Sequence, residues 1–246
     1  MFAMVRTKMA AVALVTAVLI FFFVPQMNAL SAELLEQEQQ CFCIQDLKLK
    51  FSLFLPLSLI GEGKYTLEVV HLTPETKSKI TSEFTQAVKD IKLKPFPGTA
   101  PSVLLLPITL TEITKKGEID TTACFNPRYN TIILTMRSLT GGVGSIKGVL
   151  AHEFGHWVWW NILSDDEKKE YNRITGEPGP ADLALCEKYN LDPSFLIQEW
   201  FAEDFRIYAV GESEVNKSKL GASRGCSSEL AKFFSRLVND NVPSKT

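Results

Sequence analysis

One stretch decides the fold of this chain: residues 146–163, with the sequence IKGVLAHEFGHWVWWNIL. Ser145 is a favourable N-cap residue, and the apolar run behind it predicts one continuous helix. Within the run, His152 and His156 are four residues apart, so one helical turn separates them and both imidazoles share a face. The spacing therefore predicts that both histidines bind the same metal ion, with Glu153 beside them.

The residue types of this motif indicate zinc. Imidazole nitrogens are common ligands of Zn²⁺, which keeps one coordination position open in catalytic sites. A bound zinc ion acidifies water, and the carboxylate of Glu153 is next to both predicted ligands, where it can take up the released proton. The pattern from His152 to His156 therefore predicts a zinc hydrolase in which Glu153 is the general base.

A catalytic zinc site needs a third protein ligand, and the sequence offers one on a later helix. No further histidine follows His156, and His71 lies far upstream. Residues 199–206, EWFAEDFR, place Glu199 and Glu203 one turn apart among aromatic residues, where an unpaired charge is costly to bury. We expect Glu199 to bind the metal and Glu203 to accept a hydrogen bond from a ligand histidine. An amphipathic helix with solvated charges is the alternative.

Together, HEFGH at 152–156 and the ExFAExFR pattern at 199–206 resemble the catalytic domain of anthrax lethal-factor-like zinc metallopeptidases. The resemblance covers about residues 100–210. It implies a zincin-like fold of the gluzincin type, with two histidines and one glutamate as zinc ligands. The implied ligands are His152, His156 and Glu199, the implied base is Glu153, and Glu203 is implied to support a ligand histidine.

The position that stabilises the oxyanion departs from this family. Where the family carries a tyrosine seven residues before the glutamate ligand, this chain has Asp192. Tyr189 is the nearest phenol and precedes the Glu199 helix by a short loop, so we expect it to donate to the developing negative charge. Tyr171 and Tyr208 are the weaker alternatives.

The resemblance also implies how a substrate binds. Zinc peptidases of this type hold an extended peptide along an edge strand beside the active-site helix, and residues 131–135, TIILT, form the candidate strand. A plain core strand is the alternative. The charge balance, with 26 Lys and Arg against 28 Asp and Glu, builds no basic face and argues against a nucleic-acid partner.

The order of the expected elements predicts an α+β fold, strand-rich in its N-terminal part and helical in its C-terminal part. Strands are expected at 51–60, 65–71, 103–110, 121–125 and 131–136, of which the first two form a hairpin and the last two are joined by a turn at 126–130. Helices are expected to begin at Thr73-Pro74, at Ser145 and at the capping box Ser164–Glu167, and to cover about Ser194 to Val210 and Ser228 to Asn239. Residues 175–181 are predicted to be a loop.

The N-terminus has the pattern of a secretory signal. Arg6 and Lys8 precede the apolar residues 10–24, a run shorter than the about 20 residues that span a bilayer. We expect a signal peptide over residues 1–31 and a metallopeptidase domain over 32–246, in an exported protein that is periplasmic or secreted. A membrane anchor formed by residues 10–24 is the alternative. The five cysteines fit an exported chain.

These features predict a zinc-dependent endopeptidase. Its substrate is expected to be a protein or peptide, and any contact with a membrane would come from the N-terminal segment alone. A metal hydrolase that acts on another amide is a second hypothesis with the same ligands. A non-catalytic zincin-fold binding module or toxin component is a third, although a protein that only binds has no need of Glu153.

Overall fold

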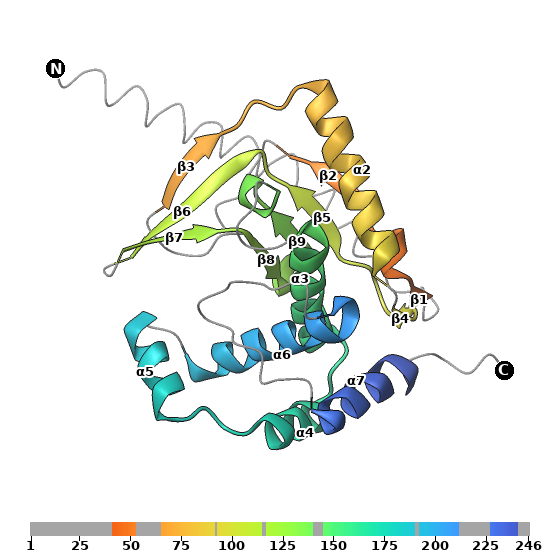
Figure 1. Cartoon of the computed structure of the whole chain (residues 1–246), viewed down its shortest axis with the longest axis vertical. Helices are drawn as coiled ribbons and strands as arrows, with labels where there is room; N and C mark the ends of the chain where they lie inside the picture. The colour runs from red at the N-terminus through yellow and green to blue at the C-terminus, as the bar shows by residue number, and fades with distance from the viewer. Residues whose placement is uncertain are drawn as a thin grey trace, which may run out of the picture. The chain divides into compact units, whose positions relative to one another are not determined.

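The computed structural model describes residues 41–52, 65–91, 93–114, 117–139, 145–189, 192–211 and 227–240 (Figure 1). The predicted signal peptide or anchor, residues 1–31, lies outside these ranges, as does the predicted domain boundary that follows it. Among the helices of the described ranges, none is both long enough and apolar enough to cross a membrane.

The larger sheet has four strands in the order β2-β5-β9-β8. The strands β2 (Leu49–Phe51), β5 (Ser102–Leu105) and β9 (Thr131–Leu134) are parallel, and β8 (Ala123–Asn126) pairs antiparallel with β9 at the edge. The turn between β8 and β9 contains a short 3-10 helix (Pro127–Tyr129), after which Asn130 has a left-handed φ of 45°. The sequence prediction of a turn at this place is confirmed.

A second sheet contains three antiparallel strands, β3 (Tyr65–Val69), β6 (Ile108–Thr114) and β7 (Gly117–Thr121), in the order β3-β6-β7. The prediction of one strand over 103–110 is wrong, because this run is divided between β5 and β6 in different sheets. Pro107 lies at the break, where its missing N–H cannot continue a ladder. The hairpin predicted between residues 51–60 and 65–71 is not among the described strand pairs, because β3 pairs with β6. Most of its first strand, residues 53–60, lies outside the described ranges. Two-residue strands β1 (Cys41–Phe42) and β4 (Phe96–Pro97) form a separate pair.

Six α-helices lie in the described part of the chain: α2 (Pro74–Asp90), α3 (Ile146–Asn161), α4 (Asp165–Thr175), α5 (Pro180–Tyr189), α6 (Pro193–Val210) and α7 (Ser228–Asp240). The predicted N-caps Thr73, Ser145 and Ser164 each accept a backbone N–H from the first turn. Helices α3 to α7 all follow the strands, which confirms the α+β class. Helix α5 is absent from the sequence prediction, which placed its first residues in a loop.

Helix α3 is buried along most of its length because other elements pack on two of its sides. Helix α2 and one face of the larger sheet form a common core with it, through side chains that include Phe84, Leu105 and Ile132. Helix α6 crosses α3 on another side, and α7 and α4 lie beyond α6 (Figure 1). Because α3 carries both histidines of the motif, this packing places them between the sheet and the C-terminal helices.

Candidate metal site

Helices α3 and α6 approach each other so closely at Gly155 that no side chain fits between them. A Cβ atom built on Gly155 would lie 2.8 Å from Cα of Ala202 and 3.1 Å from its carbonyl oxygen. The close crossing therefore depends on a residue without a Cβ atom. Glu199 precedes Ala202 by about one turn of α6, so the crossing brings it level with the histidines of α3.

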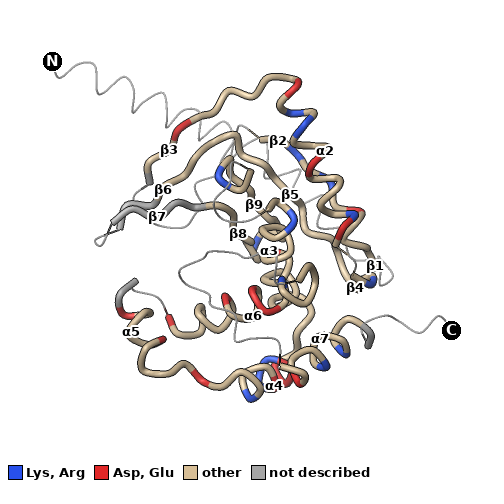
Figure 2. Tube along the Cα trace, viewed as in Figure 1, with Lys and Arg blue, Asp and Glu red and all other residues tan. Residues whose placement is uncertain are grey.

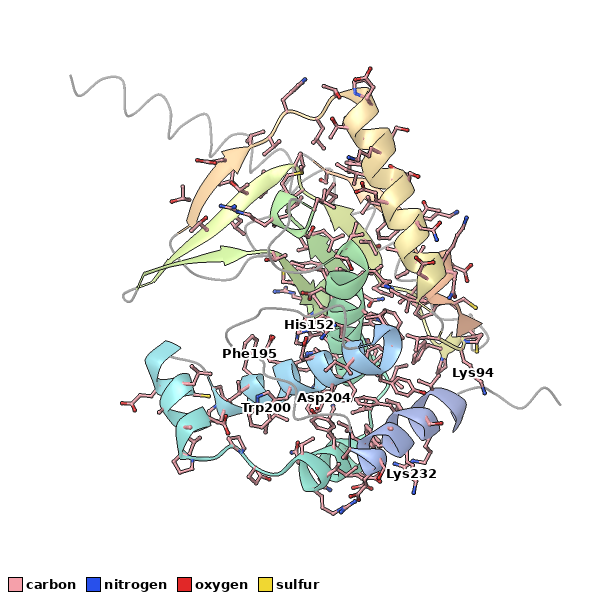
Figure 3. The ribbon with its side chains drawn as sticks, in the orientation of Figure 1. Lys94, His152, Phe195, Trp200, Asp204 and Lys232 are labelled. Atoms are coloured by element: carbon pink, nitrogen blue, oxygen red, sulfur yellow. The ribbon has the colours of Figure 1, made fainter. Side chains whose placement is uncertain are left out.

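Three side chains meet at this crossing and can hold a metal ion. The ligand atoms of His152, His156 and Glu199 all lie within 4.8 Å of one another. Nε2 of His152 is 3.4 Å from Oε2 of Glu199, and Nε2 of His156 is 3.3 Å from Oε1 of the same carboxylate. His152, labelled in Figure 3, lies where α3 passes α6. The structure thus brings together the three residues that the sequence nominated as ligands, while His71 is exposed and takes no part in this group.

The electrostatics of the site favour a bound cation. Carboxylates surround the two imidazoles, and Figure 2 shows acidic positions along α6 where it passes α3. Burial opposes ionisation of Glu199, but the charge of His156 and hydrogen bonds from both imidazoles hold the pKa of this carboxyl well below its usual range. An ionised carboxylate and two ring nitrogens at these distances form a set of three ligands that can bind a divalent metal ion.

Glu153 lies beside the three candidate ligands but is not part of their group. It is 6% exposed, and its Oε2 has no hydrogen-bond partner among the described residues. Burial raises the pKa of Glu153, an effect that the charges of His156 and His152 partly offset. A buried carboxylate with an unpartnered oxygen and a raised pKa is suited to accept a proton.

Glu203 lies behind His152 on the side away from Glu199. Its Oε2 is 3.3 Å from Nδ1 of His152 and accepts a hydrogen bond when that nitrogen carries the proton. The alternative of a solvated helix face is wrong, because Glu203, Asp204 and Arg206 are all buried. Asp204, labelled in Figure 3, accepts a hydrogen bond of 2.7 Å from the hydroxyl of Tyr171.

Three tyrosines are the candidates for the oxyanion donor. Tyr189 ends α5, and its side chain lies outside the described atoms, so its role stays a prediction. The hydroxyl of Tyr171 is directed at Asp204, and the ring of Tyr208 stacks on Phe234 in the core, with centroids 5.4 Å apart. Both alternatives therefore serve the packing of the helices in this structure.

The predicted edge strand is wrong. Residues 131–134 form β9, an inner strand between β5 and β8, and all four are buried. Among the strands of the described ranges, β8, which precedes β9, occupies the edge, and it contacts α3. Residues 131–135 were predicted as the edge because they lie just upstream of the HExxH helix, but β9 is the more hydrophobic strand of the β8–β9 pair, and hydrophobicity is what places a strand in the interior of a sheet.

The register shows which backbone groups of β8 face outward. The N–H of Thr135 donates to the carbonyl of Thr122, so Thr122, Cys124 and Asn126 direct their backbone groups towards β9. Ala123 and Phe125 direct theirs away from the sheet. The outward backbone N–H of Phe125 donates a hydrogen bond to the Glu153 carboxylate, so this edge strand lies next to the site.

Comparisons with protein-family models, with curated proteins and with solved structures found no match for this chain. The resemblance carried by the two motifs therefore stays a prediction. The arrangement of His152, His156 and Glu199 follows from the geometry of α3 and α6 and does not depend on any relative.

Gly155→Ala is expected to weaken both the fold and the metal site. The added methyl group meets backbone atoms of Ala202, which cannot rotate away, and such overpacking typically costs about 1–3 kcal/mol. Separation of α3 from α6 would also move Glu199 away from the histidines. Chemical denaturation and Zn²⁺ titration of the purified variant measure the two effects.

Gly179→Ala is the matched control for this substitution. A Cβ atom at Gly179 would meet only Oδ2 of Asp182 at 3.6 Å, an ordinary contact. Its stability and metal affinity should equal those of the wild type. If Gly155→Ala behaved in the same way as Gly179→Ala, the close crossing would not set the position of α6.

Metal binding is expected to release a proton from His152. Burial lowers the pKa of this imidazole, but its hydrogen bonds to Glu199 and Glu203 and the charge of Glu199 raise it from 6.5 to about 10 in the metal-free protein. The ring is therefore protonated at pH 7 and must lose that proton before Nε2 binds a metal. Since protons compete with the metal below the raised pKa, Zn²⁺ affinity should increase as the pH rises from 6.5 towards 10.

Calorimetric Zn²⁺ titrations in buffers of different ionisation enthalpy measure this release directly, and about one proton per zinc is expected at pH 7. Binding whose heat does not depend on the buffer would show that His152 is already neutral.

Proposed function

We propose that this chain is a zinc-dependent endopeptidase with a zincin-like domain. The convergence of His152, His156 and Glu199, with the buried Glu153 carboxylate beside them, supports this function best. Two imidazole nitrogens and one carboxylate oxygen are a ligand set typical of catalytic zinc, which leaves a fourth position open. The orphaned Oε2 of Glu153 suits that proposal, because a buried carboxylate oxygen without a partner is otherwise costly.

Each residue has a distinct task in the proposed reaction. His152, His156 and Glu199 would hold the metal, which supplies Lewis-acid chemistry when bound. Glu153 takes a proton from the attacking water and returns it to the leaving amine. Glu203 keeps Nδ1 of His152 protonated, so that Nε2 presents its lone pair to the metal side.

The substrate is proposed to be a protein or peptide bound as an extended strand along β8. The outward N–H and C=O groups of Ala123 and the outward C=O group of Phe125 can pair with a peptide backbone, which selects extended chains with little regard to sequence. Because Phe125 contacts Glu153 through its backbone, a peptide on this edge would pass next to the base. This arrangement replaces the strand at 131–135 that the sequence suggested.

Export is proposed on the sequence alone. Two basic residues precede the apolar run at 10–24, as in secretory signals, so we propose a periplasmic or secreted enzyme whose signal ends near residue 31. N-terminal sequencing of the protein recovered outside the cytoplasm tests this, since an intact N-terminus would favour the anchor.

Metal analysis of the purified full-length chain, combined with digestion of a peptide library, tests the function. We expect one zinc per chain and cleavage that a chelator abolishes and Zn²⁺ restores. Bound zinc without cleavage of any peptide would favour the binding module, or a hydrolase for a different amide. Absence of both metal and cleavage would overturn the proposal.

A further inference from the structure

A buried arginine on α6 stands behind the metal site. Arg206 is 1% exposed and follows Glu203 by three residues, so the two side chains lie on the same side of the helix. We propose that Arg206 is a positioning residue for the metal site: it fixes the Glu203 carboxylate, which in turn fixes the imidazole of His152. This inference rests on the proposed metal site and assigns a role to the arginine that ends the ExFAExFR pattern.

The contact between Arg206 and Glu203 is bidentate. Nε of Arg206 donates to Oε2 of Glu203 over 2.9 Å, and Nη2 donates to Oε1 over 2.7 Å. The planar guanidinium therefore engages both oxygens at once, which sets the position and the plane of the carboxylate. A single point charge at this place would hold only one oxygen.

The same carboxylate reaches across to α3. Its Oε2 receives the Nε bond of Arg206 and also lies 3.3 Å from Nδ1 of His152. The other nitrogen of that ring, Nε2, faces Glu199 at 3.4 Å. Arg206, Glu203, His152 and Glu199 thus form a continuous series of polar contacts, in which each group orients the next.

Burial explains why Glu203 needs this partner. The carboxylate is 3% exposed, and a buried charge is costly unless it is paired. The two-pronged contact with Arg206 provides this pairing and leaves Oε2 of Glu203 within reach of Nδ1 of His152.

Arg206 also makes a contact with the C-terminal end of α6 that does not involve the metal site. Its Nη1 lies 3.5 Å from the carbonyl oxygen of Gly211, just after the end of α6. A test must therefore separate an effect on the metal from an effect on the stability of α6.

Arg206→Lys keeps the charge but loses the two-pronged contact, so it is the informative variant. The dissociation constant for Zn²⁺, measured by competition with a chelator on the full chain, should increase roughly tenfold, as for substitutions behind other metal ligands. The d–d absorption of bound Co²⁺ should change as well, because it reports ligand geometry. Arg173→Lys is the matched control: Arg173 pairs with Glu229 on the surface, away from the ligands, and should leave both readouts unchanged.

The Glu203→Gln background distinguishes an effect of Arg206 on the metal site from an effect on the stability of α6. If Arg206 acts through Glu203, then Arg206→Lys should have no further effect on Zn²⁺ affinity in a Glu203→Gln background. If Arg206→Lys fails to fold, a double variant that combines Arg206→Met with Glu203→Gln takes its place, because it removes both buried charges. This double variant should bind Zn²⁺ as tightly as the single variant Glu203→Gln. Unchanged affinity in Arg206→Lys, or additive losses in either double variant, would overturn the inference and leave the metal site intact. A wild-type chain that binds no Zn²⁺ would instead refute the proposed function.

Discussion

Glu153→Gln is expected to bind zinc as the wild type does and to lose about 100- to 10,000-fold in peptide hydrolysis, the usual loss when a general base is removed. Glutamine keeps the size of the side chain and a hydrogen-bonding oxygen, but it cannot accept a proton from water. A loss of activity in this variant can be assigned to the missing base, because Glu153 is outside the group formed by His152, His156 and Glu199. Metal binding should therefore survive a substitution that stops the chemistry.

The measurement is a peptide-cleavage assay on zinc-loaded protein, with the zinc content of each sample determined beforehand. Glu83→Gln, on the exposed side of α2, is the matched control and should keep full activity, since its carboxylate pairs only loosely with Lys79 at 3.9 Å. Equal rates for Glu153→Gln and the wild type would show that Glu153 is not the base. The hydrolase proposal itself would then lose its main support.

Glu199→Ala is expected to remove most of the zinc while the chain stays folded. The substitution deletes one of three protein ligands, so the loss of affinity should exceed the about 10- to 100-fold that changes behind the ligands cause. The fold should persist because the Glu199 side chain lies at the ligand side of α6, while Phe201 and Phe205 supply the buried face of the helix. Circular dichroism should show unchanged helix content.

Zinc affinity of Glu199→Ala is measured by chelator competition, with Glu187→Ala on the exposed surface of α5 as the control. The control should bind zinc as tightly as the wild type. If Glu199→Ala also did so, the third ligand would have to be another residue. Activity would be uninformative in that case, and a structure with bound metal would be needed to assign the ligand.

Local signals in the sequence predicted the helices well. The caps at Thr73, Ser145 and Ser164 and the apolar spacing behind them gave the starts of α2, α3 and α4 within a residue. A cap satisfies N–H groups only a few residues away, so its energetics hardly depend on the rest of the fold. Helix α5 escaped prediction because it lacks a regular apolar face: Leu183 is exposed and Cys186 is buried.

The strands were harder because their neighbours lie far away in sequence. The position of β9 inside the sheet depends on β5, about 30 residues earlier, and on β8, which returns to cover its other side. The split of residues 103–110 into β5 and β6 depends in the same way on separate partners. Alternation and hydrophobicity indicate that a strand is present, but they do not select its partners.

The sequence by itself determined the chemistry that is available at the site. The spacing of His152 and His156 put two nitrogens on one face of one helix, because the helical period is a local property of the backbone. The later acidic pair supplied Glu199 as a possible third ligand and Glu203 as its neighbour.

Only the tertiary structure decided how these groups meet. The contact of Gly155 with Ala202 sets α6 against α3, the edge position of β8 turns the backbone N–H of Phe125 towards Glu153, and the burial of Arg206 pairs it with Glu203. Each of these depends on contacts between segments or on exclusion from water, which no local pattern encodes. A helix presents its residues according to its own period, but the distance between two helices depends on the packing of both.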